Sequence, residues 1–230
     1  LKVIDRKIQR AHKNAKADKS LQGELELLLR IKSALEEGKS ARRIDLSPDE
    51  QTFVRSLGLL SDKPVIFAAN VSEDGVGDAE SNPYVNAVVS HAKEENAGVV
   101  VLCAKLEAEL AELEEQEKEV FFQDLGITES GLDQLIRASY NLLDLISFLT
   151  AGEPEVRAWT IRRGTRAPQA AGKIHTDFER GFIRAETIPF DKLFECGGNL
   201  AAAKEKGLVR SEGKEYIVKD GDIIHFLFNV

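Results

Sequence analysis

Two continuous apolar runs of strand length place the strongest constraint on the fold of this chain. Residues 64–70 read PVIFAAN and residues 98–104 read GVVVLCA, and neither run alternates apolar with polar residues. Such runs are typical of parallel strands that are buried on both faces, and parallel strands need a crossover between them. Asn82-Pro83 can begin a connecting helix. The sequence therefore predicts a strand–helix–strand unit. The apolar face of its helix would consist of Val85, Val88, Val89 and Ala92.

Helical spacing dominates the residues before this unit. The apolar residues form two stripes, Ile4, Ile8, Ala11 and Ala15, then Leu21, Leu25, Leu28 and Leu35. The polar residues 16–20 interrupt the pattern and favour a turn, so an antiparallel helical hairpin or short coiled coil is predicted. A further helix is expected to begin at the capping sequence of residues 47–50, SPDE, and to end at Gly58.

The remaining chain favours one long helix and then a small sheet. The helix is expected from about residue 130 to residue 147, where it would cover one face of the parallel strands. After residue 152 we expect strands over 155–161 and 183–188 and a helix over 171–180 that buries Ile174 and Phe178. Residues 216–218 and 223–228 flank an Asp-Gly turn, which favours a hairpin. The last 80 residues therefore predict a four- or five-stranded sheet packed on a helix, as in a β-grasp module.

Composition excludes several classes of protein. Hydrophobic residues make up 43% of the chain and charged residues 30%, as in ordinary globular proteins. No apolar run approaches 18 residues, and the first six residues are too charged for a signal peptide. Two cysteines, Cys103 and Cys196, form neither a disulfide framework nor a metal cluster, so a cytoplasmic location is expected. The chain begins with leucine and contains no methionine, so we expect it to be a piece of a longer protein.

Charge is unevenly distributed along the sequence. Residues 1–62 have a net charge of +3, residues 63–150 of −12 and residues 151–230 of +1. Three units are therefore predicted, and a polyanion would be expected to bind at one of the two ends. The alternative explanation is that the uneven charge serves solubility alone.

Several short motifs give only weak evidence of a functional site, because the residues around them do not fit one. Gly38-Lys39-Ser40 resembles the end of a phosphate-binding loop, but position 33 is serine and no strand precedes it, so a helix end is predicted instead. The four histidines lie in different elements and predict no metal site. The acidic run over 107–119 predicts a solvated helix face.

A basic cluster lies beside the single tryptophan, Trp159. Arginine side chains can pair with RNA phosphates, and an aromatic neighbour is common at such sites. Surface solubility, or pairing with Glu153 and Glu155, is the alternative. The arginines of this cluster are Arg157, Arg162, Arg163 and Arg166.

The sharpest candidate site follows the two apolar runs. Asn70-Val71-Ser72-Glu73 ends the first run, and Cys103-Ala104 ends the second. Open α/β sheets bind their ligands at the carboxyl ends of parallel strands. In nucleotide sites of the G-protein type, two such strand ends hold the base.

These residues make the chain similar to the YchF-type, or Obg-like ATPase, branch of the Obg family of P-loop nucleotidases. Asn70-x-x-Glu73 resembles the altered base-recognition motif of this branch, which replaces the Asn-Lys-x-Asp motif of ordinary GTPases. Three further segments are similar to the TGS domain of the family, namely residues 156–161, 167–185 and 216–230. The resemblance covers the whole chain.

The resemblance implies an α/β plus α+β fold in three parts. Residues 1–62 would form a helical coiled-coil arm, residues 63–150 the C-terminal part of a parallel-sheet G domain, and residues 151–230 a β-grasp TGS domain. The phosphate-binding loop, the switch regions and the magnesium contacts of the family would precede Leu1. The complete protein is then expected to hydrolyse ATP or GTP with magnesium, whereas this chain alone would be inactive and contains no catalytic or metal-binding residue.

The resemblance also implies a base site formed by Asn70, Val71, Glu73, Cys103 and Ala104. Glu73 is one methylene longer than the aspartate that pairs with guanine N1 and N2, so the guanine contact is expected to be lost. The Asn70 amide can match N7 and N6 of adenine, which favours ATP over GTP. In the alternative interpretation, Asn70 caps a strand-end turn and Glu73 faces solvent.

The function implied is that of a ribosome-associated nucleotide hydrolase acting in translation or stress regulation. Its expected partners are an adenine nucleotide and the ribosome or RNA, with no membrane and no DNA. The alternative is a non-enzymatic module whose arm and TGS domain bind RNA or a protein.

Overall fold

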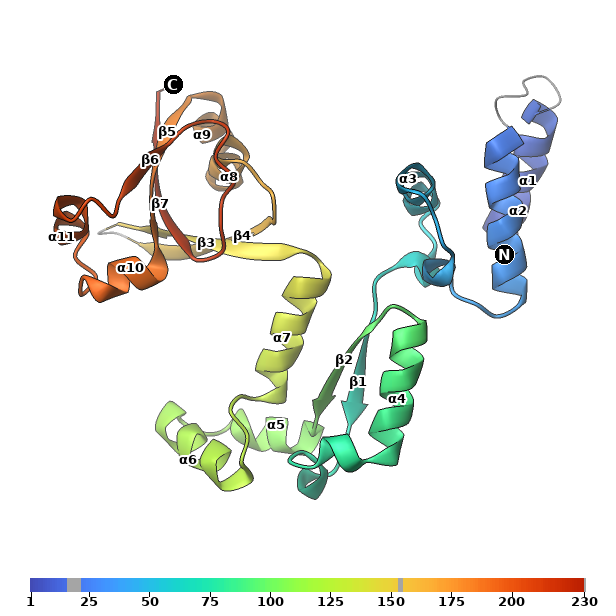
Figure 1. The fold of residues 1–230 in the computed structure, drawn as a ribbon, viewed down its shortest axis with the longest axis horizontal. Helices are drawn as coiled ribbons and strands as arrows, with labels where there is room; N and C mark the ends of the chain where they lie inside the picture. Colours follow the sequence, from blue (N-terminus) through green and yellow to red (C-terminus); the bar gives the residue numbers. More distant parts are fainter. Residues whose placement is uncertain (16–21, 153–154, 230) are drawn as a thin grey trace. The chain divides into compact units, whose positions relative to one another are not determined.

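The computed structural model describes residues 1–15, 22–152 and 155–229 (Figure 1). The chain divides into two compact units, Leu1–Ser139 and Tyr140–Val230. Each unit is described by itself below. The predicted turn over 16–20, together with Leu21, lies outside the described residues.

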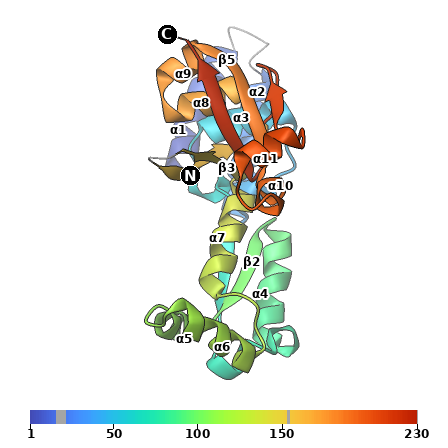
Figure 2. The same cartoon turned by 90° about the vertical axis from the view of Figure 1, so that its left-hand side faces the viewer.

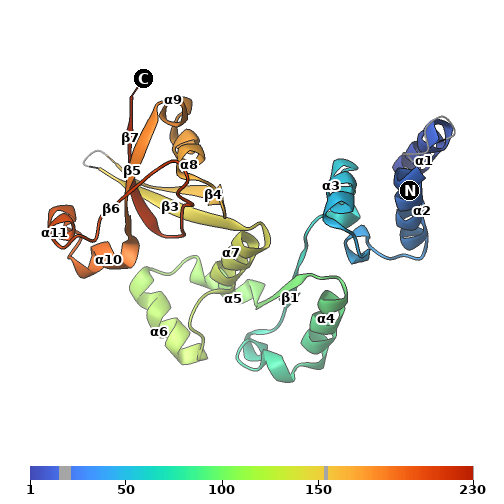
Figure 3. The ribbon, with the colours of Figure 1, turned by 45° about the horizontal axis from the view of Figure 1, so that its top comes forward.

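Three helices form an apolar core at the start of the first unit. They are α1 (Lys2–Ala15), α2 (Gln22–Glu36) and α3 (Pro48–Ser56), with one 3-10 turn, Ala41–Arg43, before α3 and another, Leu60–Asp62, after it. Helices α1 and α2 lie side by side (Figures 1 and 3). Their core contains four fully buried side chains, Ile4, Leu28, Ile31 and Val54. The helical spacing predicted from the two apolar stripes is therefore confirmed.

The predicted start and end of α3 are confirmed. Ser47 Oγ accepts a hydrogen bond from the Glu50 amide at 3.3 Å, and the Glu50 carboxylate accepts one from the Ser47 amide at 2.8 Å. Gly58 follows the helix with a φ of +64°, a left-handed conformation that glycine adopts without strain.

The predicted strand–helix–strand unit is present. Strands β1 (Ile66–Asn70) and β2 (Gly98–Leu102) are parallel, and α4 (Pro83–Glu94) connects them. Asn82 caps α4 by accepting a hydrogen bond from the Tyr84 amide at 2.9 Å. The expectation of burial on both faces is wrong, because only Ala69 and Val100 are buried within the two strands. In the described part of the chain this sheet has two strands, so each strand has one unpaired edge.

Three helices follow β2, namely α5 (Ala104–Leu110), α6 (Glu115–Leu125) and α7 (Gly131–Leu142). The acidic run is divided between α5 and α6 rather than lying on one helix. The helix predicted up to residue 147 ends at Leu142, and this correction has a local cause. Asp144 adopts a φ of +54°, which ends helical geometry, and β3 (Leu145–Ala151) begins directly after it.

A five-stranded sheet forms the second unit, as predicted for the C-terminal part of the chain. Its order is β4 (Val156–Arg162), β3, β7 (Asp222–Phe228), β5 (Phe182–Pro189) and β6 (Arg210–Glu212). Strands β3 and β7 are parallel, and the other neighbours are antiparallel. The helices of this unit are α8 (Ala167–Ile174), α9 (Thr176–Arg180), α10 (Phe190–Glu195) and α11 (Leu200–Glu205).

The core of this unit lies between the sheet and α8, which Figure 2 shows beside the strands. Ala170 and Ala171 of α8 are buried together with Phe148 and Ile224 of the sheet. The helix predicted over 171–180 is in fact two helices, because His175 has an extended conformation with a φ of −157°.

The predicted hairpin between 216–218 and 223–228 is wrong. The turn itself exists, and Gly221 has a φ of +76°. However, Ile217 forms an isolated bridge with Arg166, whereas β7 pairs with β3 and β5. The Asp222 carboxylate explains the turn, because it accepts hydrogen bonds from the Lys219 amide at 2.9 Å and the Tyr216 hydroxyl at 2.6 Å.

None of the helices in the described residues is long and apolar enough to cross a membrane.

Candidate functional site

The carboxyl ends of β1 and β2 bring the predicted base-binding residues together. Asn70 is the last residue of β1, and its Oδ1 accepts a hydrogen bond from the Ala104 amide at 2.9 Å. The Val71 amide donates to the Leu102 carbonyl at 2.9 Å. These two contacts tie the loop after β1 to the start of α5, so both loops face the same end of the sheet.

The contact with Ala104 fixes the orientation of the Asn70 side chain. Cys103 precedes α5 but provides no side-chain cap, and Asn70 instead satisfies the first amide of the helix. With Oδ1 engaged, the Nδ2 group is directed to other partners, and it makes no hydrogen bond to any residue that the structure describes. The match of Asn70 to both N6 and N7 of adenine stays a prediction, and it would require Oδ1 to accept a second hydrogen bond beside the one from Ala104.

Glu73 points to a residue that the sequence did not single out. Its carboxylate forms an ion pair with Lys105 Nζ, and Lys105 also lies 3.8 Å from Glu109. The hydrogen bond that Lys105 donates to the Glu73 carboxylate, together with the charge of this carboxylate, raises the pKa of Lys105 above the ordinary value of 10.5. Both side chains are largely exposed, so the pair orients Glu73 but contributes little to stability. The sequence contained one indication of Lys105, namely its position in the first turn of the helix that follows the second strand.

Cys103 is 4% exposed, so its side chain cannot face a ligand. Only the backbone of Cys103 can therefore contribute to the strand-end site. Close packing fixes this region, because a Cβ on Gly131 would lie 2.6 Å from the Leu102 Cβ. Glu107 accepts hydrogen bonds from the amides of Gly131 and Leu132 at 2.7 and 3.1 Å. Glu107 therefore caps α7 and is not part of a solvated face.

The structure separates one arginine of the basic cluster from the other three. Arg157 lies near the start of β4 with its guanidinium 4.3 Å from the Trp159 ring centroid. Arg162 ends the same strand five residues later, which is about 17 Å away in an extended chain. Arg163 and Arg166 follow in the next turn, where they pair with Asp144 at 3.1 Å and Glu215 at 3.0 Å. The predicted pairing partner Glu153 lies outside the described residues.

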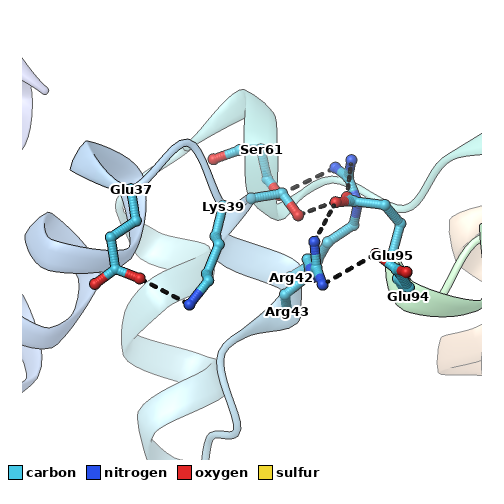
Figure 4. A network of polar contacts seen from close by, with 8 residues as sticks. Glu37, Lys39, Arg42, Arg43, Ser61, Glu94 and Glu95 are labelled. Carbon is cyan, nitrogen blue, oxygen red and sulfur yellow. Dashed lines mark hydrogen bonds and ion pairs between the residues drawn. The ribbon is translucent and has the colours of Figure 1, made fainter. Parts of the chain in front are cut away.

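A buried polar network lies at the end of α4, where Glu95 meets the segment between α2 and α3 (Figure 4). Glu95 is 5% exposed, accepts a hydrogen bond from Ser40 Oγ at 2.6 Å and forms an ion pair with Arg42 Nη2, also at 2.6 Å. Arg42 also donates to the Ser61 carbonyl at 3.1 Å. The hydrogen bond from Ser40 and the nearby guanidinium groups lower the pKa of Glu95. Sequence reasoning missed this network because its members lie 55 residues apart.

The Gly38-Lys39-Ser40 segment has structural contacts only. Gly38 ends α2 with a φ of +77°, Lys39 Nζ pairs with Glu37 at 2.7 Å, and Ser40 binds Glu95. The prediction of a helix end rather than a phosphate loop is therefore confirmed. No group of three metal-ligating side chains occurs within residues 1–15, 22–152 and 155–229.

The C-terminal unit contains an apolar pocket of about 400 Å³ that the sequence did not predict. It lies between the sheet and the segment of α10 and α11, and Glu186 forms part of its wall. Lys204 donates to the Glu186 carboxylate at 2.8 Å and lowers the pKa of this carboxyl. The apolar lining consists mainly of Ile188, Leu193, Leu200, Val209 and Ile223.

Comparison with known proteins relates both units to one family. Residues 145–229 match the family YchF-GTPase_C, described as a protein of unknown function (DUF933). The chain is 52% identical to the ribosome-binding ATPase YchF of Bacillus subtilis, over 100% of this chain and 63% of that protein. The corresponding protein of Escherichia coli O157:H7 is 49% identical over 100% of this chain and 62% of its own length.

A solved structure is similar across both units. The YchF GTPase of Schizosaccharomyces pombe matches with a TM-score of 0.84 and 32% identity, covering 98% of this chain and 61% of that protein. The chain thus spans less than two thirds of the length of each of these relatives.

Proposed function

Because this chain belongs to the YchF family, we propose that it contributes the base-binding end and the C-terminal module of a ribosome-associated nucleotide hydrolase. The observation that supports the base site most directly is the hydrogen bond between Asn70 Oδ1 and the Ala104 amide. It holds two strand-end loops together and leaves Asn70 Nδ2 available as a donor. The names of the relatives, ribosome-binding ATPase and GTPase, supply the rest of the proposal.

In this proposal Asn70 recognises a purine and Glu73 selects between purines. Asn70 Nδ2 donates to N7, an acceptor that adenine and guanine share. Guanine selection requires a carboxylate opposite N1 and N2, whereas the Glu73 carboxylate is paired with Lys105. GTP would therefore lack the carboxylate contact that selects guanine, whereas ATP does not need this contact. The arrangement agrees with the expected preference for ATP.

The described residues fit the base of the nucleotide but not its phosphates. Asn70 offers an exposed amide at the strand ends, whereas the only glycine-lysine-serine segment is held in structural contacts. We therefore assign base binding to this chain and place no hydrolysis step on its residues. Magnesium and phosphate contacts belong to the complete protein in this proposal.

We also propose the identity of the parts. Residues 1–62 form the coiled-coil arm, and the following residues, from 63, form part of a G domain. The TGS-type module begins near residue 145, where the family match and β3 both begin, rather than at residue 151. Ribosome association, which implies a cytoplasmic location, would use Arg162, Arg163 and Arg166 at one end of β4.

Two substitutions at Asn70 test base binding on the ¹⁵N-labelled chain titrated with ATP by NMR. Asn70→Asp keeps an oxygen for the Ala104 amide but removes the Nδ2 donor. We expect ATP to shift the Val71 and Ala104 amide signals of the wild type, and to shift them at least tenfold less effectively in Asn70→Asp. The matched control is Asn82→Asp, a helix cap that aspartate can replace.

Equal ATP binding by wild type and Asn70→Asp would refute the assignment of Asn70. Absence of any ATP-dependent shift in the wild type, together with retained binding to ribosomes, would instead favour the non-enzymatic RNA- or protein-binding alternative. Replacing Arg162 and Arg163 by glutamine should weaken ribosome binding, and unchanged binding would remove them from the proposal.

A further inference from the structure

We propose that the apolar pocket of the C-terminal unit binds an acidic peptide segment of another protein through a bulky apolar side chain. This pocket of about 400 Å³ is called here the sheet pocket. Ile188 of β5 and Ile223 of β7, which are cross-strand partners, line its floor, and Leu193 and Leu200 line its wall. Helices α10 and α11, which carry this wall, lie on the other side of β5 and β7 from α8 (Figures 1 and 3).

The position of the sheet pocket follows from the alternation of side chains along β5 and β7. Ala185 and Phe226 are paired across the two strands and pack in the core beside α8. The neighbouring pair, Glu186 and His225, points to the other face, and both residues line the pocket. Ile188 lies on this second face and is only 1% exposed, so the pocket reaches below the surface to an apolar floor.

The size and lining of the sheet pocket suit a bulky apolar side chain. Its volume lies within the range of about 300–1,000 Å³ that is usual for binding sites. Apart from Glu186 and His225, the lining residues are aliphatic or glycine. A leucine or phenylalanine of a peptide could therefore act as an anchor. A nucleic-acid base fits less well, because burying its polar edges without hydrogen bonds costs free energy.

Exposed apolar side chains at the mouth of the pocket favour a protein over a small molecule. Leu200 and Val156 line the pocket and are nevertheless 42% and 73% exposed. Phe194 follows Leu193 of the wall, and its ring stacks on that of Phe190 with the centroids 6.1 Å apart. Both phenylalanines are more than half exposed. A small molecule would fill the pocket without covering these residues, whereas exposed apolar patches are typical of protein-binding sites.

The charges beside the sheet pocket favour an acidic partner. Lys204 lowers the pKa of Glu186 through its hydrogen bond and its charge, and it neutralises this carboxylate at 2.8 Å. Arg184 and His225 lower the same pKa through their charges, so three basic groups lie near one carboxylate. Within the described residues, no carboxylate lies within 4.0 Å of the Arg184 guanidinium. A carboxylate that flanks the apolar anchor could therefore pair with Arg184.

The test begins with phage-displayed random peptides, which are selected on the immobilised 230-residue chain. We expect the selected peptides to contain leucine or phenylalanine next to aspartate or glutamate. A selected peptide is then labelled with fluorescein, and its binding to the wild type and to variants is measured by anisotropy. Failure to enrich any peptide, or enrichment of basic peptides, would overturn the proposal.

Two pairs of variants assign the binding to the sheet pocket. Leu200→Gln removes an apolar side chain at the mouth and should weaken binding about tenfold, whereas Leu143→Gln, an exposed leucine outside the pocket, should have no effect. Arg184→Gln should weaken binding about fivefold, and this difference should shrink as salt is added. Its control, Arg180→Gln, changes an exposed arginine at the end of α9. Equal affinities of Leu200→Gln and Leu143→Gln for the peptide would exclude the pocket.

Other occupants of the pocket give different results. Displacement of the peptide by oligouridine from the wild type and Leu200→Gln alike would contradict the proposal in favour of RNA. Self-association that Leu200→Gln abolishes, without any selected peptide, would assign the pocket to a second copy of the chain. The proposal does not depend on the strand-end site, because the NMR titration with ATP reports on the first unit and peptide binding on the second.

Discussion

Replacing Glu95 by glutamine should destabilise the N-terminal unit strongly. Glutamine keeps the shape of the side chain but removes the charge that Arg42 Nη2 contacts at 2.6 Å. Arg42 is 18% exposed, so its guanidinium would remain mostly buried without its counter-ion. Removing one partner of a buried pair costs about 3–5 kcal/mol. Because the Ser40 hydroxyl can still bond to the amide, we expect the lower end, about 3 kcal/mol.

Urea unfolding measures this loss in each unit separately. With a slope of about 2 kcal/mol per molar urea, the midpoint of the affected unit should fall by roughly 1.5 M. Far-UV circular dichroism follows the helices of both units, whereas the single tryptophan, Trp159, lies in the C-terminal unit. We expect the dichroism transition to begin at lower urea while the Trp159 fluorescence transition stays in place.

Glu94 supplies the matched control. Its side chain is 62% exposed and lies 3.4 Å from Arg43, and exposed pairs contribute about 0–1 kcal/mol. Glu94→Gln should therefore leave both transitions nearly unchanged. Equal midpoints for Glu94→Gln and Glu95→Gln would refute the reasoning from burial.

The same network predicts a dependence on pH. The Ser40 hydrogen bond, together with the charges of Arg42 and Arg43, holds the pKa of Glu95 below its ordinary value of 4.5. A carboxyl whose pKa is lower in the folded state stabilises the fold above its unfolded pKa, and this stability is lost as pH falls through the folded pKa. The difference in unfolding free energy between wild type and Glu95→Gln should therefore be constant above about pH 5.5 and shrink below pH 4.5. A constant difference down to pH 3 would contradict the assignment.

Two further predictions concern the strand-end site. In a complete family member, Val71→Lys with Glu73→Asp should shift the ratio of ATP to GTP affinity towards GTP by about tenfold, as measured by nucleotide titration, and an unaltered ratio would exclude both residues from selection. Gly131→Ala should cost about 1–3 kcal/mol in urea unfolding because its methyl group would overlap Leu102, whereas Gly23→Ala, with nothing within 4 Å, should be neutral or stabilising.

Local signals were sufficient for elements whose determinants are close in sequence. The capping box at Ser47 and the Asn82 cap each depend on residues two or three positions apart, and both were predictable. The parallel pairing of β1 and β2 followed from two apolar runs joined by a helical pattern. The order of the strand ends also predicts that Asn70 and Ala104 lie near each other, as they do.

Tertiary contacts decided the elements whose pattern was ambiguous. Ile146 suits both a helix and a strand, and pairing with Ile161 of β4 selects the strand. The residues before β7 have strand composition, yet β3 and β5 occupy both edges of β7 and exclude a hairpin. No local sequence window contains these partners, so propensity alone could not resolve them.

The sequence by itself therefore determined the strand–helix–strand unit, the caps of α3 and α4 and the similarity to the YchF family. Only the tertiary structure decided which polar groups pair: Asn70 with Ala104 across 34 residues, Glu73 with Lys105, and Ser40 with Glu95. The physical reason is range. Helix caps and apolar periodicity are set by neighbours along the chain, whereas a hydrogen bond or ion pair requires two groups within about 4 Å in space, a distance that folding alone fixes.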